Sequence, residues 1–159
     1  FERSFQLMSQ VAGRAGRKNK QGKVIIQTYR PDHEVIQDVV ENNFEDLYKR
    51  QMTERNRFQY PPYYRLIQVR LLYRDYKLLN KAAAVLATQL NSTFPKKVLG
   101  PEYPLVSRIK NQYIKQILIK TSRKESVHSV KDELQRQLAD FSSIKEFKKI
   151  RIRIDVDPY

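Results

Sequence analysis

Cysteine is absent from this sequence, and only four of its 159 residues are glycine. Without cysteine there is no disulfide framework and no thiolate metal site, which suits an intracellular protein. His33 and His128 lie far apart, so we expect each to be an ordinary surface or core residue rather than one of the roughly four ligands of a zinc site. No apolar run approaches the ~18 residues that a membrane span needs, and residues 1–12 do not form a secretory signal. The sequence therefore predicts a cytoplasmic protein with no metal site and no membrane partner.

Positive charge is abundant and unevenly spread. The net charge is +14, and by segment it is +6 over residues 1–30, −3 over 31–60, +10 over 61–125 and +1 over 126–159. A basic surface attracts polyanions, because each phosphate that it neutralises releases condensed counterions. This favours a nucleic-acid partner but does not choose between DNA and RNA. A basic soluble surface, or a face that docks an acidic protein, stays open as an alternative.

Residues 1–60 alternate between helical and strand patterns. Apolar spacings of three and four predict a helix over about the first twelve residues, ending near Gly13, and GRKNKQG (16–22) predicts a polar loop. The β-branched stretch KVIIQTY (23–29) predicts a strand. Residues 32–58 predict one long helix or two consecutive ones, with Asp32 as the N-cap. A chain that starts inside a helix, without a cap or methionine, suggests an excised piece of a longer protein.

The stretch YPPYY (60–64) predicts a domain junction, because two prolines cannot continue a helix. Beyond it, apolar alternation predicts strands at 65–72 and 149–156, and two more within 103–121 joined by a turn at Asn111 and Gln112. Helical stripes are predicted over 76–90 and from Val127 to Phe141, the second preceded by a capping box between Ser122 and Glu125. The order strand, helix, strand, strand, helix, strand predicts an α+β, ferredoxin-like βαββαβ sheet with both helices on one face.

The stretch QVAGRAGR (10–17) places two of the four glycines beside two arginines. Glycine lets the backbone come close to a ligand, and arginine offers a rigid fork that matches phosphate oxygens. Arg14 and Arg17, three residues apart on a turn loosened by glycine, can both point at one anionic group. Positive charge on a phosphoryl group stabilises the charge that develops during its transfer.

The stretch FQLMSQVAGRAGR resembles motif VI of superfamily 2 helicases, of the form Q-x-x-G-R-x-x-R. Together with GKVIIQTYRPDHEVI it closely resembles the PriA family of bacterial primosomal helicases, also called primosomal protein N′ or replication factor Y. The resemblance continues through YPPYYRL and IRIDVDP, so it covers most of the chain. It implies that residues 1–60 are the last helix, strand and helices of a second RecA-like lobe. Residues 61–159 would be a C-terminal domain of the NusE type.

The resemblance also implies catalytic and nucleotide-binding roles. Arg17 would act as an arginine finger on the γ-phosphate of ATP, Arg14 and Gly13 would lie at the same nucleotide cleft, and Gln10 would couple nucleotide state to lobe closure. The whole protein would be an ATP-dependent 3′-to-5′ DNA helicase that restarts stalled replication forks in the bacterial cytoplasm. Its expected partners are branched and single-stranded DNA, the single-stranded-DNA-binding protein and other primosome proteins, and we expect a monomer.

Parts of a helicase site are missing from these residues. There is no G-x-x-x-x-G-K-[ST] phosphate loop and no acidic box for magnesium. ATP and Mg²⁺ are therefore expected in the full-length protein, with zinc in an upstream module by resemblance, and none is expected to bind here. We expect this chain alone to be inactive as an ATP hydrolase.

Basic residues that face outward from the C-terminal sheet or lie on its rims are the candidates for DNA contact. They are Arg70, Arg74, Lys96, Lys97, Arg108, Lys110, Lys115, Arg151 and Arg153. Tyr63, Tyr64, Tyr103 and Tyr113 could stack on unpaired bases, although tyrosines near a junction often pack domain against domain. Two other functions stay open: a stand-alone nucleic-acid-binding module, which could bind RNA, and a scaffold that docks acidic protein tails.

Overall fold

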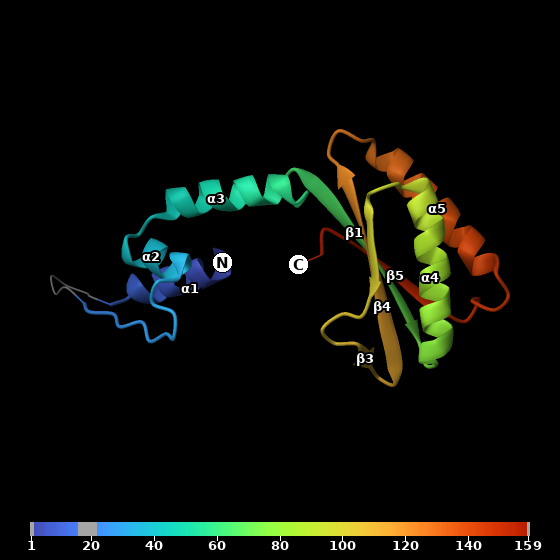
Figure 1. Cartoon of the computed structure of the whole chain (residues 1–159), viewed down its shortest axis with the longest axis horizontal. Coiled ribbons are helices and arrows are strands. Elements are labelled where there is room, and N and C mark those ends of the chain that lie inside the picture. The colour runs from blue at the N-terminus through green and yellow to red at the C-terminus, as the bar shows by residue number, and fades with distance from the viewer. Residues whose placement is uncertain (1, 16–21, 159) are drawn as a thin grey trace. The chain divides into compact units, whose positions relative to one another are not determined.

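The computed structural model describes residues 2–15 and 22–158, which form two compact units, Phe1–Arg57 and Phe58–Tyr159 (Figure 1). The division falls after residue 57, whereas the sequence predicted it after residue 60. The difference arises because Phe58 and Tyr60 are held by the second unit. The Lys120 ammonium donates a hydrogen bond to the Phe58 carbonyl at 2.6 Å and lies 3.9 Å from the centre of the Tyr60 ring.

In its described residues the first unit contains three helices: α1 (Glu2–Ala12), α2 (Glu34–Val40) and α3 (Phe44–Arg57). Residues 32–58 thus form two helices rather than one. The helices meet at a small apolar cluster of Phe5, Val35 and Leu47. An ion pair of 2.7 Å between Glu2 and Arg55 joins α1 to α3.

Two predictions for this unit are wrong. Residues 23–29 form no strand, because all five strands lie in the second unit and the described part of the first unit offers no strand with which they could pair. The N-cap of α2 is His33 and not Asp32. The Val35 amide donates a hydrogen bond to Nδ1 of His33 at 3.3 Å, so an imidazole nitrogen replaces the expected carboxylate.

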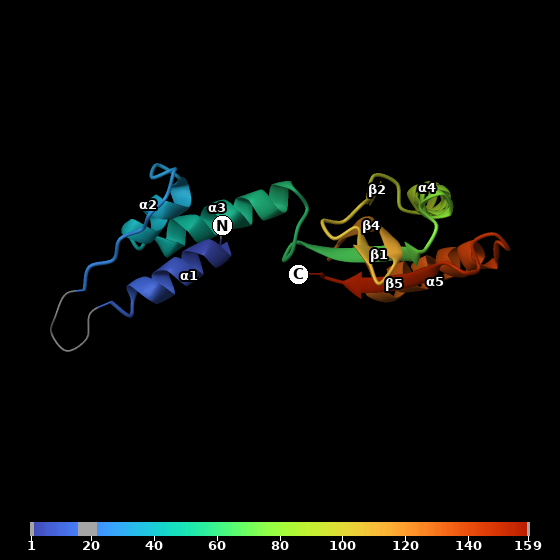
Figure 2. The same ribbon diagram turned by 90° about the horizontal axis from the view of Figure 1, so that it is seen from below.

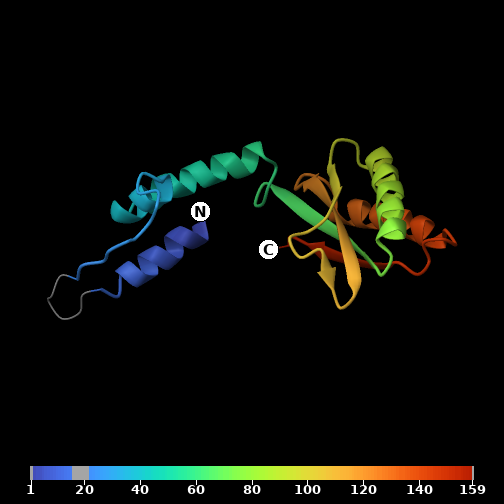
Figure 3. The same ribbon diagram turned by 60° about the horizontal axis from the view of Figure 1, so that its bottom comes forward.

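The second unit contains β1 (Tyr64–Tyr73), α4 (Tyr76–Thr93), β2 (Val98–Glu102), β3 (Arg108–Ile109), β4 (Gln112–Ser122), α5 (Val127–Ser143) and β5 (Arg151–Val156). The strands form one antiparallel sheet in the order β2-β4-β1-β5, with β3 paired to β4 (Figures 1 and 3). The α+β class is confirmed, and so are the predicted positions of β1, α4, α5 and β5.

Three details of this unit differ from the sequence prediction. Strand β2 was missed, because Gly100 and Pro101 indicate a loop; proline is tolerated there since β2 is an edge strand. The hairpin turn lies at Lys110 and Asn111, both with positive φ, one residue before the predicted position. The helix α5 begins after Ser126, which caps it, although Glu125 does accept from the Ser122 amide at 3.2 Å as a capping box requires.

One core holds the second unit together. Alternate residues of β1 and β4, among them Val69, Leu71 and Ile117, pack against Leu79 and Leu86 of α4 and against α5. Because both helices cover the same core cluster, they lie on one face of the sheet and leave the other face uncovered (Figures 1 and 2). Asp75 starts α4 by accepting hydrogen bonds from the amides of Lys77 and Leu78, at 2.8 and 3.2 Å.

Candidate nucleic-acid interface

The sheet face that α4 and α5 leave uncovered, here called the open face, carries three arginines. Arg70 on β1 stands directly opposite Arg153 on β5, and Arg151 stands opposite Leu72. Directly opposed residues of an antiparallel pair share a face, and neighbouring residues alternate between faces. Since Val69 and Leu71 point into the helix-covered core, Arg70 points the other way. The register places these residues on the open face: Leu66, Gln68, Arg70, Leu72, Leu99, Glu102, Ile114, Gln116, Leu118, Lys120, Arg151, Arg153 and Asp155. Three of them, Leu66, Leu72 and Ile114, are buried.

A chain of amide hydrogen bonds crosses the open face beside these arginines. Gln68 donates from Nε2 to Gln116 Oε1 at 3.0 Å, and Gln116 donates from Nε2 to Glu102 Oε1 at 2.8 Å. The carboxylate of Glu102 can only accept, which fixes the orientation of Gln116 and in turn that of Gln68. The buried Gln68 Oε1 has no hydrogen-bond partner among the described residues. The negative charge of Glu102 thus lies on the β2 side, and the three arginines lie on the β1–β5 side.

The three arginines form no ion pair among the described residues, although Asp155 of β5 lies on the same face, two residues along the strand from Arg153. Within the described ranges, the ion pairs of the second unit involve Lys81, Lys97 and Arg136, and none involves Arg70, Arg151 or Arg153. Arg151 and Arg153 are exposed, and Arg70 is partly exposed. Residues 58–159 carry 20 Lys and Arg against nine Asp and Glu, a net charge of +11. Three unpaired guanidinium groups on one flat face of a basic unit can bind the phosphates of an extended polyanion.

The other predicted basic residues lie away from the open face. Arg74, Lys96 and Lys110 are exposed in turns. Lys97 forms an ion pair of 2.7 Å with Glu125, and this hydrogen bond holds the pKa of the Glu125 carboxyl below its ordinary value. The structure therefore brings together three of the nine predicted basic residues and distributes the rest over the rims.

Two of the predicted stacking tyrosines already hold a cation. The Lys115 ammonium lies 3.8 Å from the centre of the Tyr103 ring, and the Arg108 guanidinium lies 4.9 Å from the centre of the Tyr113 ring. Lys115 stands opposite Leu71, so it belongs to the helix-covered face. Tyr63 is exposed and Tyr64 partly so. Tyr63 and Tyr103 are exposed to a similar extent, 41% and 43%, but among the described residues only the Tyr103 ring of these two has a lysine over it.

The described part of the glycine–arginine motif lies at the C-terminal end of α1. Gln10, Gly13 and Arg14 are exposed there, and Arg14 forms no ion pair among the residues that the structure describes. A Cβ atom at Gly13 would come no closer than 3.4 Å to its neighbours, so packing within the chain does not require glycine at this position. Arg17 and Gly16 lie outside the described residues.

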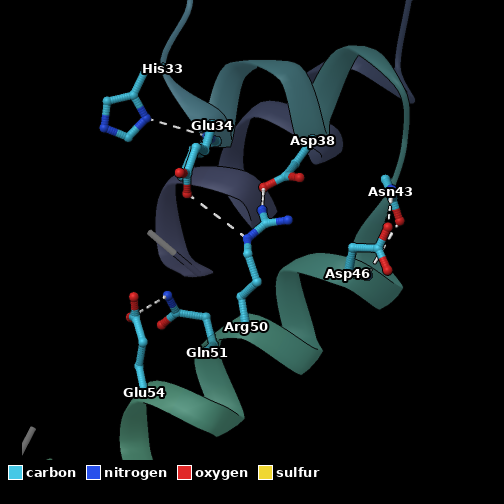
Figure 4. Close-up of polar contacts among 9 residues, drawn as sticks. His33, Glu34, Asp38, Asn43, Asp46, Arg50, Gln51 and Glu54 are labelled. Carbon is cyan, nitrogen blue, oxygen red and sulfur yellow. Dashed lines mark hydrogen bonds and ion pairs between the residues drawn. The ribbon is translucent and has the colours of Figure 1, made fainter.

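The first unit also contains a cleft of about 620 Å³ between α3 and the segment that leads into α2 (Figure 4). Several of its polar side chains are bound to one another. Arg50 pairs with the buried Asp38, which raises the pKa of the guanidinium, and lies 3.9 Å from Glu34. Gln51 donates to Glu54 at 3.4 Å. The contacts of Arg50 join α2 to α3, so this part of the cleft lining stabilises the unit.

Metal ligands are not grouped in this structure. Among the residues described, no three His, Cys, Asp or Glu side chains lie close enough to hold a metal ion. Nor is any helix there long and apolar enough to cross a membrane. The donor sets for zinc or magnesium that the family resemblance implies therefore do not fit the residues described here.

Sequence reasoning missed the amides of Gln68 and Gln116 and the anchoring role of Lys120. Alternation along β1 does place Gln68 and Arg70 on one face, but it does not say which residues of β4 stand beside them. That information is the register of the sheet, which depends on contacts between segments about fifty residues apart.

The fold and the open face define a basic α+β domain with an antiparallel sheet, and comparison with known proteins places it in a family. Residues 56–159 match the family described as the primosomal protein N C-terminal domain. Replication restart protein PriA of Bacillus subtilis is 36% identical over 160 residues, covering 99% of this chain and 20% of that protein. Those of Synechocystis and Chlamydia pneumoniae are 39% and 33% identical, covering 75% and 99% of this chain and 15% and 20% of theirs.

This chain therefore belongs to the PriA family and carries its C-terminal domain. It spans about a fifth of the length of the curated relatives that it matches.

Proposed function

We propose that the second unit binds branched and single-stranded DNA through the open face, as part of a cytoplasmic helicase that restarts stalled replication forks. The observation that carries this proposal is the grouping of Arg70, Arg151 and Arg153, without acidic partners, on the sheet face that no helix covers. Phosphate contacts of this kind position a nucleic acid without reading its sequence. Such contacts suit a protein that must act at forks of any sequence.

The topology supports a ferredoxin-like fold of the NusE type for this unit. The sheet order β2-β4-β1-β5, with antiparallel pairing throughout and both helices against one core, is the arrangement that a split βαβ fold requires. The three helices of residues 1–57 would then be the end of a RecA-like lobe. Single-stranded-DNA-binding protein and other primosome proteins would be partners of the whole protein.

The test is a fluorescence anisotropy titration of the chain with a labelled DNA fork that has a single-stranded arm, repeated over a series of salt concentrations. The variant replaces Arg70, Arg151 and Arg153 with glutamine. If each arginine contacts a phosphate, affinity falls and the slope of log K against log salt decreases by about two. A matched control replaces Lys77, Lys145 and Lys148, which are exposed on α4 and in the turn after α5, and removes the same charge.

Equal loss of affinity in both triple variants would overturn the proposal, because only net charge would then matter. Tighter binding to an RNA hairpin than to the fork would favour a stand-alone RNA-binding module. Absence of binding at low salt would favour a scaffold that docks acidic proteins.

We propose further that the end of α1 forms one wall of a nucleotide site. Exposed Gln10 and Arg14, and a glycine that packing within the chain does not demand, support the approach of an external phosphate. ATP with Mg²⁺ would supply the phosphoryl group whose hydrolysis drives the helicase. Arg17 would place its guanidinium on the γ-phosphate, where it stabilises the charge of the transition state.

Replacing Arg17 with alanine in the complete protein should lower ATP turnover by about 10³-fold or more, the range measured for arginine fingers. Fork binding should change little, because the open face is intact. Arg3→Ala is the control, since Arg3 is an exposed arginine of α1 outside the glycine–arginine motif. Unchanged turnover in Arg17→Ala would remove the finger assignment without affecting the DNA-binding proposal.

A further inference from the structure

Strand β5 has a free edge. It pairs with β1 on one side, and no strand among the described residues pairs with its other side. The opposite edge of the sheet differs, because β2 contains Pro101, which has no N–H, and a register shift between Leu99 and Glu102. Proline and irregular pairing are devices that blunt an edge strand. The edge formed by β5 has a regular register over six residues and is not blunted in this way.

The register shows which backbone groups face outward. The Asp157 amide donates to the Leu66 carbonyl at 2.7 Å, so this position is a hydrogen-bonded pair of the antiparallel ladder. Such pairs alternate along a strand, so the backbone groups of Arg151, Arg153 and Asp155 point toward β1. The N–H and C=O groups of Ile152, Ile154 and Val156 therefore point toward the free edge, and none of them makes a hydrogen bond there within the described part of the chain.

An apolar groove runs beside this edge on the helix-covered face. It is a cavity of about 190 Å³ between α5 and β5, lined by the side chains of Ile67, Val130, Leu134, Ile154 and Val156. Ile154 is 48% exposed and Val156 60% exposed, which is high for β-strand residues that lie against a core. The groove could take the apolar side chains of an added strand, which would alternate with side chains on the open face.

The charges around the edge select the partner. Arg151, Arg153 and Asp155 flank it on the open face, and Arg65, Lys131 and Glu125 line the groove, so basic groups outnumber acidic ones by four to two. We propose that the free edge of β5 accepts an extended segment of another protein in which acidic residues alternate with apolar ones. The segment would add a strand to the sheet, with its carboxylates beside Arg151 and Arg153 and its apolar side chains in the groove.

A second copy of this chain is the less favoured occupant. An antiparallel pairing of two β5 strands could place Arg153 opposite Asp155, but it would bring together two units of net charge +11. An acidic segment gains from the same field. The proposal shares Arg151 and Arg153 with the DNA-binding proposal, but it does not depend on DNA binding, because the backbone edge and the groove are separate features.

The test uses the chain of 159 residues and a fluorescein-labelled peptide, Asp-Val-Asp-Ile-Asp-Val, measured by anisotropy. The control peptide has the same sequence, with alternate amides N-methylated so that one edge cannot donate hydrogen bonds. On the protein, Ile154→Pro removes an outward N–H that makes no bond to β1, and Ile154→Val keeps it. We expect about tenfold weaker binding when the N–H donors are removed, either from the peptide by N-methylation or from the protein by Ile154→Pro. Binding of the unmodified peptide should also slow hydrogen exchange at the amides of Ile152, Ile154 and Val156.

Equal binding of both peptides would overturn the proposal, because charge alone would then explain the association. A dimer of the wild-type chain in sedimentation that Ile154→Pro abolishes would also overturn it and assign the edge to a second copy. If Ile154→Pro fails to fold, the two peptides on the wild-type chain still decide the question. Fork binding by Ile154→Pro, measured in parallel, separates failure of this proposal from failure of the DNA-binding one, because only peptide binding requires the outward N–H.

Discussion

Glu125 links three segments of the second unit through one carboxylate. Its Oε2 atom accepts from the Lys97 ammonium at 2.7 Å, and its Oε1 atom accepts from the Ser122 amide at 3.2 Å. Both hydrogen bonds favour the ionised form, and the bond from Lys97 is the larger cause, so the pKa of Glu125 is lowered despite partial burial. The turn that joins α4 to β2 is thereby fixed to the turn that precedes α5.

The depressed pKa makes this link dependent on pH. A carboxyl group whose pKa is lower in the folded state contributes stability above its unfolded value of 4.5, and this stability is lost as the pH falls through the folded pKa. Lys97→Met should raise the pKa of Glu125 in the folded state, which NMR titration of the side-chain carboxyl measures directly. The difference in free energy of unfolding between wild type and Lys97→Met should reach its largest value above pH 4.5 and decrease as the pH falls below it.

The control for this prediction is Lys124→Met, which removes an exposed lysine one residue away from Glu125. It should leave the Glu125 titration close to that of the wild type. An unchanged pKa in Lys97→Met would show that the bond from Ser122, and not the ion pair, sets the titration.

At the scale of elements, β2 depends on one glycine. Gly100 has φ +99°, and a Cβ atom there would lie 2.9 Å from the Gln116 carbonyl oxygen and 3.2 Å from the Glu102 amide nitrogen. These neighbours are backbone atoms of the sheet and cannot move independently. Glycine is required because both the dihedral angle and the close approach of β4 exclude a side chain.

Gly100→Ala should therefore destabilise the second unit by about 1–3 kcal/mol, the usual cost of a residue forced into a disfavoured backbone region. Urea denaturation followed by circular dichroism measures the change. Gly13→Ala is the matched control, because its Cβ atom would meet nothing closer than 3.4 Å. Equal midpoints for Gly100→Ala and wild type would contradict the steric argument.

The elements also show where sequence prediction succeeds. Apolar alternation predicted the positions of β1 and β5 correctly. In each strand one set of alternate side chains faces the helix-covered side of the sheet, and the other set belongs to the open face. The β-branched residues of 23–29 predicted a strand that is not there, since a strand needs a partner and residue propensity does not reveal one. The open face was half predictable: Arg70, Arg151 and Arg153 were identified as outward residues, but the register that groups them requires the folded sheet.

At the scale of the whole molecule, the two units differ in the size of their cores. Sixteen buried residues form the core of the second unit, whereas three form that of the first, counting the described residues. Each fully buried aliphatic or aromatic side chain contributes about 1.5–3 kcal/mol, so the first unit has much less apolar stabilisation. Unequal cores predict unequal stability within one chain.

We therefore expect α1, α2 and α3 to open at lower temperature or denaturant concentration than the sheet. Hydrogen exchange measured residue by residue should show weak protection in residues 2–57 and strong protection in β1, β4 and α4. A shortened chain of residues 58–159 should show the circular dichroism spectrum of a folded α+β unit. Its melting temperature should equal that of the second unit in the full chain. One cooperative transition with uniform protection would contradict this prediction.

The position of β1 between β4 and β5 has a consequence for synthesis. Ile67 of β1 pairs with Ile119 of β4 on one side and with Val156 of β5 on the other. The ribosome therefore makes β1 long before β5, its second neighbour in the sheet. Until β5 has emerged from the ribosome, β1 is itself an exposed edge and the core under α5 lacks Ile150 and Ile152. The nascent unit must complete its sheet late in translation, and during that interval it is the strand β1, rather than β5, that needs protection from aggregation.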